Sequence, residues 1–408
     1  MNSKVVTKHA FFLLILLKNY FTIEEYITKK NFKRSVDQIN NFIFNFSETF
    51  YSKINSRKKR KIVSNEHAKW YLPINYHVSE PLNPFVIRKV IETIEKETCI
   101  KFQYQKSFAP FTTGIIYLYT GNCLSFVGNI RRDNWQVVEI GKRCDYVGGI
   151  LHETLHALGL YHEQCRFDRD FFVKIYKENM MKSNVHDCQK YNVDSAFHYH
   201  LSYDYGSIMQ YPVDAFSING RKTMVPIDPL YEGTMGQMER LSFIDSKILN
   251  LHYCSHMCTF KKLCYNYGYQ DPQNCHICRC IEGFTGPLCK DFEKKRPRCG
   301  APILFTLKTV KFMILKGKKN CIYHFISKQK KKILLNILKL YMFPNYQPAC
   351  KYNNVVEIKY WMDKSVTGAR FCLQQYNKKI LSHTDSMILH YRSLQNTNFV
   401  QLTYRELN

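Results

Sequence analysis

The sequence predicts an α+β fold in several domains, in which a domain around a metal-binding helix precedes a small cysteine-rich module and a strand-rich segment. The first observation is the pattern His-Glu-x-x-His-x-x-Gly-x-x-His from His152 to His162. The second is a run of six cysteines between Cys258 and Cys289, and the third is a following segment rich in β-branched and aromatic residues. At 408 residues the chain is too long for one ordinary core, so two or three domains are expected.

The histidine spacing points to a catalytic zinc site. On an α-helix, His152 and His156 differ by about 40° around the axis, so both imidazoles can reach one Zn²⁺ ion. Gly159 can take the left-handed conformation that ends a helix, which lets His162 approach as third ligand. Glu153 is placed to take a proton from bound water. Three protein ligands leave a position open for that water, as in catalytic sites. The alternative is a helix with satisfied core histidines.

The continuation of this pattern to Asp170 resembles the HExxHxxGxxHExxRxDRD signature of the astacin family of metzincin proteases. The resemblance implies a zincin-like catalytic domain, one Zn²⁺ ion per subunit and zinc metalloendopeptidase activity on protein or peptide substrates. The segment Ser207–Tyr211 is similar to the family's Met-turn. Met209 would then lie beneath the zinc, and Tyr211 would be a fifth ligand that swings away to stabilise the oxyanion. Glu163 is similar to the residue that binds the new N-terminus after pro-peptide removal, so its implied role is structural.

Cys165 departs from the astacin pattern, in which a small or apolar residue is usual. A thiolate three residues beyond a zinc ligand could be reactive or metal-binding. The other hypothesis is a disulfide with Cys188, the cysteine that remains when every pair implied by the resemblance is assigned. Four charged residues nearby are expected to form a buried ion-pair network that shapes the turn: Arg166, Asp168, Arg169 and Asp170.

The N-terminal part is interpreted as a removable leader. Lys4 and Lys8 precede the apolar run 10–17, which favours a signal peptide over residues 1–17 and is too short to span a bilayer. Residues 18–60 are expected to be a pro-region, and the basic run Arg57–Arg60 is expected to be cut by a convertase-type protease, although such a run can also be a solvated charge cluster. The lone Asn-x-Ser/Thr acceptor, Asn45, lies in this part.

Residues 61–254 are expected to form the astacin-like catalytic domain. The resemblance implies a first strand over 70–78. Apolar spacing predicts an amphipathic helix over 83–97 with Val86, Val90, Ile91 and Ile94 inward and a strand over 114–119, and the zinc helix is expected over 147–159. The resemblance implies the disulfides Cys99–Cys254 and Cys123–Cys144.

The cysteine cluster in residues 255–290 resembles an EGF-like module, which is too small for a core and is held by disulfides. A zinc knuckle is the alternative. The resemblance implies the pairs Cys258–Cys275, Cys264–Cys278 and Cys280–Cys289, although spacing alone does not fix connectivity.

In residues 299–408, Val355–Lys359 and Gly368–Cys372 resemble CUB-domain signatures. That resemblance implies a β-sandwich with the disulfides Cys299–Cys321 and Cys350–Cys372. Asn354 stands where calcium-binding CUB domains usually carry Asp, so no calcium is expected, and Lys328–Lys332 is expected to be an exposed loop or hairpin tip.

Sixteen cysteines favour an oxidising compartment, so we expect a secreted, extracellular protein with no transmembrane segment. The net charge of +26 is concentrated at the ends, because residues 61–254 balance 21 basic against 21 acidic side chains while residues 290–408 carry 23 against 6. The basic C-terminal module could hold acidic glycans or matrix. The alternative is a simple compositional bias, since the whole chain is rich in Lys, Asn, Ile, Tyr and Phe. No recognition motif favours nucleic acid.

The prediction is a secreted zinc endopeptidase, made as a zymogen, whose EGF-like and CUB-like modules dock on a substrate, extracellular matrix or cuticle. The alternative is a catalytically weak adhesive or regulatory binding protein.

Overall fold

The computed structural model describes residues 62–63, 66–107, 112–131, 133–190, 199–345 and 349–407. The chain divides into two compact units, residues 1–58 and residues 59–408, and the described residues all belong to the second. The expected signal peptide, the pro-region, Asn45 and the basic run therefore lie outside the described residues. Among the residues that are described, no helix is long and apolar enough to cross a membrane.

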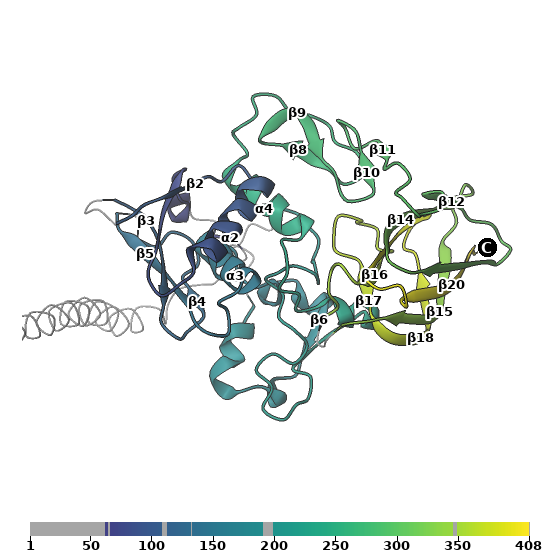
Figure 1. Cartoon of the computed structure of the whole chain (residues 1–408), viewed down its shortest axis with the longest axis horizontal. Coiled ribbons are helices and arrows are strands. Elements are labelled where there is room, and N and C mark those ends of the chain that lie inside the picture. The colour runs from purple at the N-terminus through teal and green to yellow at the C-terminus, as the bar shows by residue number, and fades with distance from the viewer. Residues whose placement is uncertain are drawn as a thin grey trace, which may run out of the picture. The chain divides into compact units, whose positions relative to one another are not determined.

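A five-stranded sheet organises the catalytic region, residues 62–254, which Figure 1 draws in purple to teal. Its order is β2-β1-β3-β5-β4, and β4 is the strand that runs antiparallel to its neighbour. The predicted strand 114–119 is β3, whereas the strand expected from Trp70 starts only at Ile74, because Pro73 has no N–H for the ladder. The strands are β1 (Ile74–Val78), β2 (Phe102–Tyr104), β3 (Gly114–Tyr119), β4 (Leu124–Ser125) and β5 (Trp135–Ile140).

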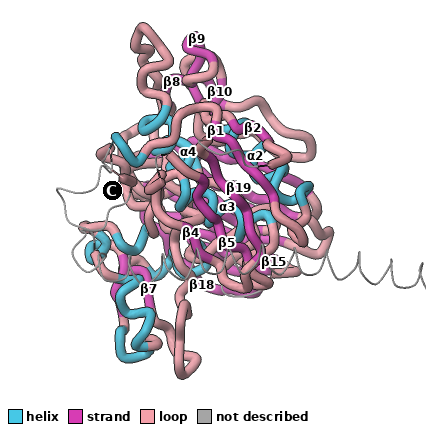
Figure 2. Tube along the Cα trace, turned by 90° about the vertical axis from the view of Figure 1, so that its left-hand side faces the viewer, coloured by secondary structure: helices cyan, strands magenta, loops and turns pink. Residues whose placement is uncertain are grey.

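Three α-helices accompany this sheet, and α2 packs against α3 (Figure 2). Asn83 caps α2 by accepting a hydrogen bond from the Phe85 N–H at 3.0 Å, and Pro84 occupies the first helical position, where no N–H is needed. Of the predicted inward residues, Val90, Ile91 and Ile94 are buried as expected, but Ile87 takes the place of Val86, which is only partly buried. The helices are α2 (Pro84–Glu97), α3 (Val147–Ala157) and α4 (Phe243–Tyr253).

Short elements connect these parts. They are the 3₁₀ helices η1 (Glu66–Ala68), η2 (Glu163–Cys165), η3 (Arg169–Phe171), η4 (Lys177–Asn179), η5 (Lys182–Cys188) and η7 (Pro229–Thr234), and the antiparallel strands β6 (Val173–Ile175) and β7 (Met224–Pro226).

The EGF-like module has two small antiparallel ladders. They are β8 (Tyr269–Asp271) with β9 (Asn274–Arg279), and β10 (Phe284–Thr285) with β11 (Asp291–Phe292). Three disulfides hold it, in the order implied by the resemblance: Cys258–Cys275, Cys264–Cys278 and Cys280–Cys289. Four further disulfides are formed elsewhere: Cys99–Cys254, Cys123–Cys144, Cys299–Cys321 and Cys350–Cys372.

The expected Cys165–Cys188 disulfide is not among the bonds that the structure forms in its described part. Both side chains are buried, and Cys165 Sγ donates to the backbone carbonyl oxygen of Asp187 at 2.8 Å. Burial also raises the pKa of Cys188 to about 11, which keeps that group a thiol. The disulfide hypothesis is therefore corrected: Cys165 and Cys188 are buried cysteines that are not bonded to each other.

The C-terminal region is a sandwich of two sheets, ordered β12-β14-β19-β16-β17 and β13-β20-β15-β18, drawn in green to yellow in Figure 1. The basic run Lys328–Lys332 is exposed, as expected, but it joins β14 of one sheet to β15 of the other and so is not a hairpin tip. The strands are β12 (Ile303–Phe305), β13 (Lys311–Lys316), β14 (Lys319–Ile326), β15 (Ile333–Met342), β16 (Val355–Lys359), β17 (Ala369–Phe371), β18 (Leu373–Leu381), β19 (Ser386–Ser393) and β20 (Phe399–Glu406).

The sandwich and the catalytic region share a hydrophobic core. Tyr203, Tyr205 and Tyr231 of the catalytic region belong to the same cluster of buried side chains as the inward residues of both sandwich sheets. A separate cluster fills the space between the five-stranded sheet and helices α2, α3 and α4. Because apolar burial is the main stabilising term, the shared cluster makes the sandwich an integral part of this unit.

Candidate metal centre

Helix α3 runs through the interior and is buried from Gly148 to Ala157. The start of the helix requires a glycine at position 148, since a Cβ there would lie 1.6 Å from the backbone oxygen of Met238. The helix ends at Ala157, two residues earlier than expected, and Leu158 is its C-cap. His152 and His156 are therefore held on a rigid, deeply packed element.

The three histidines of the motif meet at one point. Nε2 of His162 lies 3.2 Å from Nε2 of His152 and 3.0 Å from Nε2 of His156, and the three groups satisfy the spacing of a metal-ion site. The Nδ1 atom of His152 faces the Ile208 carbonyl oxygen at 2.9 Å, and that of His156 faces the Leu160 carbonyl oxygen at 2.7 Å. These partners favour the tautomer that carries its proton on Nδ1 and leaves Nε2 as a ligand atom.

Electrostatics agree with this arrangement. Burial lowers the pKa of His152 to about 4 and, together with His152, that of His156 to about 3, so both rings are neutral at physiological pH. Neutral imidazole nitrogens are good zinc ligands, and three of them leave a position for water or substrate. The residues present therefore fit a catalytic Zn²⁺ ion.

Gly159 directs the chain from the second histidine to the third. Its φ of +103° is the conformation expected from the sequence. The first described residues pack on this turn, since the Val63 N–H donates to the Gly159 carbonyl oxygen at 3.1 Å and Ile62 forms a β-bridge with Leu160. Ile62 and Val63 thus pack directly on the turn that links His156 to His162.

Glu153 follows the first histidine on α3 and is 7% exposed. Burial raises its pKa to about 8, with a smaller contribution from Glu139. A nearby divalent cation acts in the opposite direction and favours the carboxylate. The pKa of the Glu153 carboxyl group therefore lies in the range that suits a general base and acid at neutral pH.

The loop predicted to be the Met-turn contacts the first histidine through the Ile208 carbonyl oxygen. Met209 is fully buried in the same apolar cluster as α3. Asp245, at the N-terminus of α4, holds the loop, because its carboxylate accepts from Ser207 Oγ at 2.6 Å and from the Ile208 N–H at 3.0 Å. The loop in turn positions the Ile208 carbonyl oxygen against His152.

The Tyr211 ring lies against the third histidine, with 4.3 Å between the two ring centroids. Its backbone N–H donates to Gln164 Oε1 at 3.1 Å. Burial raises the Tyr211 pKa well above its usual value, so the hydroxyl keeps its proton and can donate a hydrogen bond.

Residues after His162 form the expected ion-pair network in part. Arg166 is buried and donates to both oxygens of Asp168 at 2.8 Å and to Glu163 Oε1 at 3.2 Å. Arg169 is also buried and reaches Asp170 at 2.6 Å, although Asp170 itself is exposed. Glu163 is fully buried and also accepts from the Asp204 N–H at 3.0 Å, which ties the turn to the loop before Met209.

Two acidic residues of this region were not predicted. Asp245 forms a capping box with Ser242, and the pattern Ser-x-x-Asp before an apolar run could have indicated it. Asp204 is fully buried beside the Met-turn, and no local pattern distinguishes it, because its partners include a residue more than 160 positions away.

Comparison with known proteins agrees with these observations. The sequence model of the Astacin peptidase family matches residues 62–254. The chain is 32% identical over 353 residues to Zinc metalloproteinase nas-34 of Caenorhabditis elegans, covering 86% of this chain and 57% of that one. It is 30% identical over 380 residues to nas-29 of the same organism, covering 85% and 69%. The chain spans about half the length of the curated relatives it matches, with 57% of nas-34 but 45% of nas-37 of the same organism.

Among solved structures, High choriolytic enzyme 1, a hatching enzyme zinc-protease from Oryzias latipes, matches with 30% identity and a TM-score of 0.41, covering 47% of this chain and 92% of that one. The predicted cofactor, one Zn²⁺ ion, is confirmed by the relatives and by the three-histidine group. Since the three-histidine centre, the buried Met209 and the matched region coincide, this chain belongs to the astacin family of peptidases.

Proposed function

We propose that this chain is a zinc-dependent endopeptidase that hydrolyses peptide bonds of protein substrates. The observation that carries the proposal is the convergence of three Nε2 atoms on one point, with Glu153 on the same helix and Tyr211 against His162. His152, His156 and His162 would hold the ion.

In that position the ion would supply Lewis-acid chemistry, polarising the scissile carbonyl and lowering the pKa of a water molecule. Glu153 takes the proton from the attacking water and afterwards passes it to the leaving amine. Tyr211, whose hydroxyl stays protonated, donates a hydrogen bond to the oxygen that becomes negative. Asp245 holds the Ile208 peptide by accepting its N–H, and the Ile208 carbonyl oxygen in turn orients the His152 ring.

The same proposal includes synthesis as a zymogen cut by a convertase-type protease at Arg57–Arg60. Its support is the burial of Ile62 and Val63 against the Gly159 turn, because this placement packs the start of the processed chain directly on the turn that links His156 to His162. Glu163, buried beside that turn, has the structural role of fixing the new N-terminal segment.

We also infer secretion into an extracellular, oxidising compartment, since seven disulfides hold the described residues. The EGF-like and CUB-like modules would dock the enzyme on a protein substrate, on extracellular matrix or on cuticle.

The test is proteolysis of a denatured general protein substrate by the zinc-loaded processed chain. Glu153→Gln should lower kcat by about 10²–10⁴-fold while one zinc remains bound, because it removes the proton acceptor and no ligand. Glu92→Gln, at an exposed position on α2, is the matched control and should retain activity.

A chelator should abolish the activity and added zinc should restore it. If wild type and Glu153→Gln are equally inactive while each binds one zinc, the endopeptidase proposal is wrong. That result would favour the catalytically weak adhesive or regulatory protein instead.

A further inference from the structure

A cavity of about 750 Å³ lies between the end of α2, the loop before α4, the EGF-like module and the sandwich. None of its described lining residues belongs to the three-histidine centre. Its volume falls in the range of about 300–1,000 Å³ that is usual for small-ligand sites. The proposed peptidase mechanism makes no use of it.

The cavity wall carries an excess of positive charge. Three carboxylates line it, Glu97, Glu282 and Glu357. Six basic side chains line it as well: Lys96, Arg240, Arg279, Lys359, Arg370 and Arg392. In a partly enclosed site, where water screens less, such an excess attracts anions more strongly than on an open surface.

The three carboxylates already have partners among these cations. Glu357 accepts from Arg370 Nε and from Arg392 Nη1, each at 3.2 Å, and Glu282 accepts from Arg392 Nη2 at 2.6 Å. Burial opposes ionisation of both carboxyls, but the surrounding positive charges outweigh it and hold the pKa of each well below the usual range. Both groups are therefore ionised. Glu97 pairs with Arg279 at 3.0 Å.

Positive charge remains after these pairs are formed. Arg370 is 4% exposed, uses Nε for Glu357, and leaves Nη1 with no hydrogen-bond partner in the described structure. Arg240 forms no ion pair within the described ranges. Lys359, also buried, donates only to the carbonyl oxygens of Lys364 and Val366. A buried N–H donor without an acceptor is costly, and Arg370 Nη1 is such a donor, so a bound anion would supply the missing acceptor.

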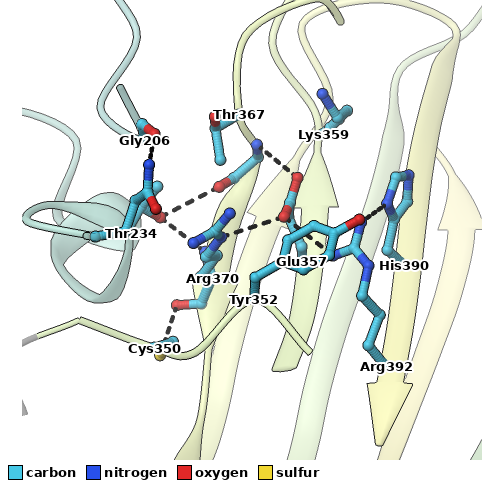
Figure 3. A network of polar contacts seen from close by, with 12 residues as sticks. Gly206, Thr234, Cys350, Tyr352, Glu357, Lys359, Thr367, Arg370, His390 and Arg392 are labelled. Carbon is cyan, nitrogen blue, oxygen red and sulfur yellow. Dashed lines mark hydrogen bonds and ion pairs between the residues drawn. The ribbon is translucent and has the colours of Figure 1, made fainter. Parts of the chain in front are cut away.

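Tyr352 orders the guanidinium groups, as Figure 3 shows for Arg370 and Arg392 beside its ring. The guanidinium carbons of Arg240 and Arg392 each lie 4.1 Å from the ring centroid, and that of Arg370 lies at 5.8 Å. Stacking on an aromatic face keeps the edge of a guanidinium, with its N–H groups, available to another acceptor.

We propose that this cavity is a binding site for a tetrahedral oxyanion, a sulfate or phosphate group, held chiefly by Arg240 and Arg370. Planar guanidinium forks pair with such oxyanions through two parallel hydrogen bonds. Because Arg240 comes from the catalytic region and Arg370 from the sandwich, an occupant held by both would cross-link these two parts. The proposal does not depend on the proposed peptidase activity.

The experiment is calorimetric titration of the zinc-loaded processed chain, at constant ionic strength, with inorganic phosphate, inorganic sulfate and a sulfated disaccharide. We expect saturable binding of one equivalent. Arg240→Gln should weaken it at least tenfold, because a charge-assisted hydrogen bond contributes about 1.5–3 kcal/mol. The fold should survive this change, since Arg240 is exposed and donates only one long bond, to the Leu241 oxygen.

Arg88→Gln is the matched control, because Arg88 is an exposed arginine on α2 that does not line the cavity. It should bind the anions as wild type does. Tighter binding of the disaccharide than of free sulfate identifies a sugar-borne group, whereas comparable binding of the free ions identifies a small anion, and both outcomes support the site. No saturable binding of any probe to wild type, or unchanged affinity in Arg240→Gln, overturns it.

Discussion

Thr367 of the sandwich donates its backbone N–H to Oδ1 of Asp204 in the catalytic region at 3.0 Å. Asp204 is fully buried, its Oδ1 also accepts from the Gly206 N–H at 3.0 Å, and its own carbonyl oxygen accepts from the Ser207 N–H. The loop that leads to Met209 is therefore anchored by a residue of another module. This contact connects the sandwich with the loop whose Ile208 carbonyl oxygen faces His152.

Asp204→Ala should destabilise the chain by roughly 2–4 kcal/mol, because the N–H groups of Thr367 and Gly206 would lose their acceptor while buried. Unfolding in urea measures the change. Asp214→Ala, at an exposed position in the same region, is the control and should stay within about 0.5 kcal/mol of wild type. Equal stability of the two variants would show that the sandwich does not anchor the loop.

Gly159→Ala should weaken both folding and zinc binding. A Cβ there requires an unfavourable positive φ and would lie 2.8 Å from a methyl group of Val63. Gly220→Ala is the matched control, since Gly220 also has a positive φ but has open space around it. We expect Gly159→Ala to cost about 1–3 kcal/mol more than the control and to raise the dissociation constant for zinc in equilibrium dialysis. A cost no greater than that of Gly220→Ala contradicts this reasoning.

Removal of zinc should lower the unfolding temperature, because a ligand that binds only the native state stabilises it by RT ln(1 + [L]/Kd), about 4 kcal/mol at a thousandfold excess over Kd. Scanning calorimetry with and without chelator measures the shift. In His156→Ala the shift should be greatly reduced, since one of three ligands is lost. A full shift in that variant would place the stabilising ion elsewhere.

Acid should weaken the junction between the EGF-like module and the sandwich through His324. Its Nε2 lies 3.0 Å from the Gly283 carbonyl oxygen, and the rings of Phe284 and Phe292 pack around it. Burial lowers the His324 pKa from 6.5 to about 4, with His390 acting in the same direction and Glu293 in the opposite one. Between these values the unfolded chain binds a proton that the native chain does not, so stability rises with pH across this window and falls as pH drops from 6.5 to 4.

From about pH 7 to about pH 5, His324 should account for a loss of about 2 kcal/mol in unfolding free energy. His324→Gln should remove that part of the pH dependence in urea unfolding. His276→Gln, at an exposed position, should leave it unchanged. If wild type and His324→Gln show the same pH slope, the histidine is not responsible.

Much of the fold was predicted because its determinants are local. The Asn-Pro start and the apolar spacing predict helix α2. Val86 was expected to face inward in place of Ile87, because spacing alone does not tell which of two adjacent apolar residues is the more buried. The Cys165–Cys188 prediction failed for a related reason: pairing by elimination tells nothing of where a thiol points, and Cys165 Sγ points to the Asp187 carbonyl.

The sequence by itself determined the zinc centre, because His152, Glu153, His156 and His162 lie within eleven consecutive positions, where helix geometry and one glycine turn bring them together. Only the tertiary structure decided what supports that centre and what surrounds it. Asp204 accepts a hydrogen bond from Thr367, which lies 163 residues later in the chain, and the guanidinium groups of Arg240 and Arg392 both lie over the ring of Tyr352. Such pairs follow from packing of whole modules against one another, which no local spacing encodes.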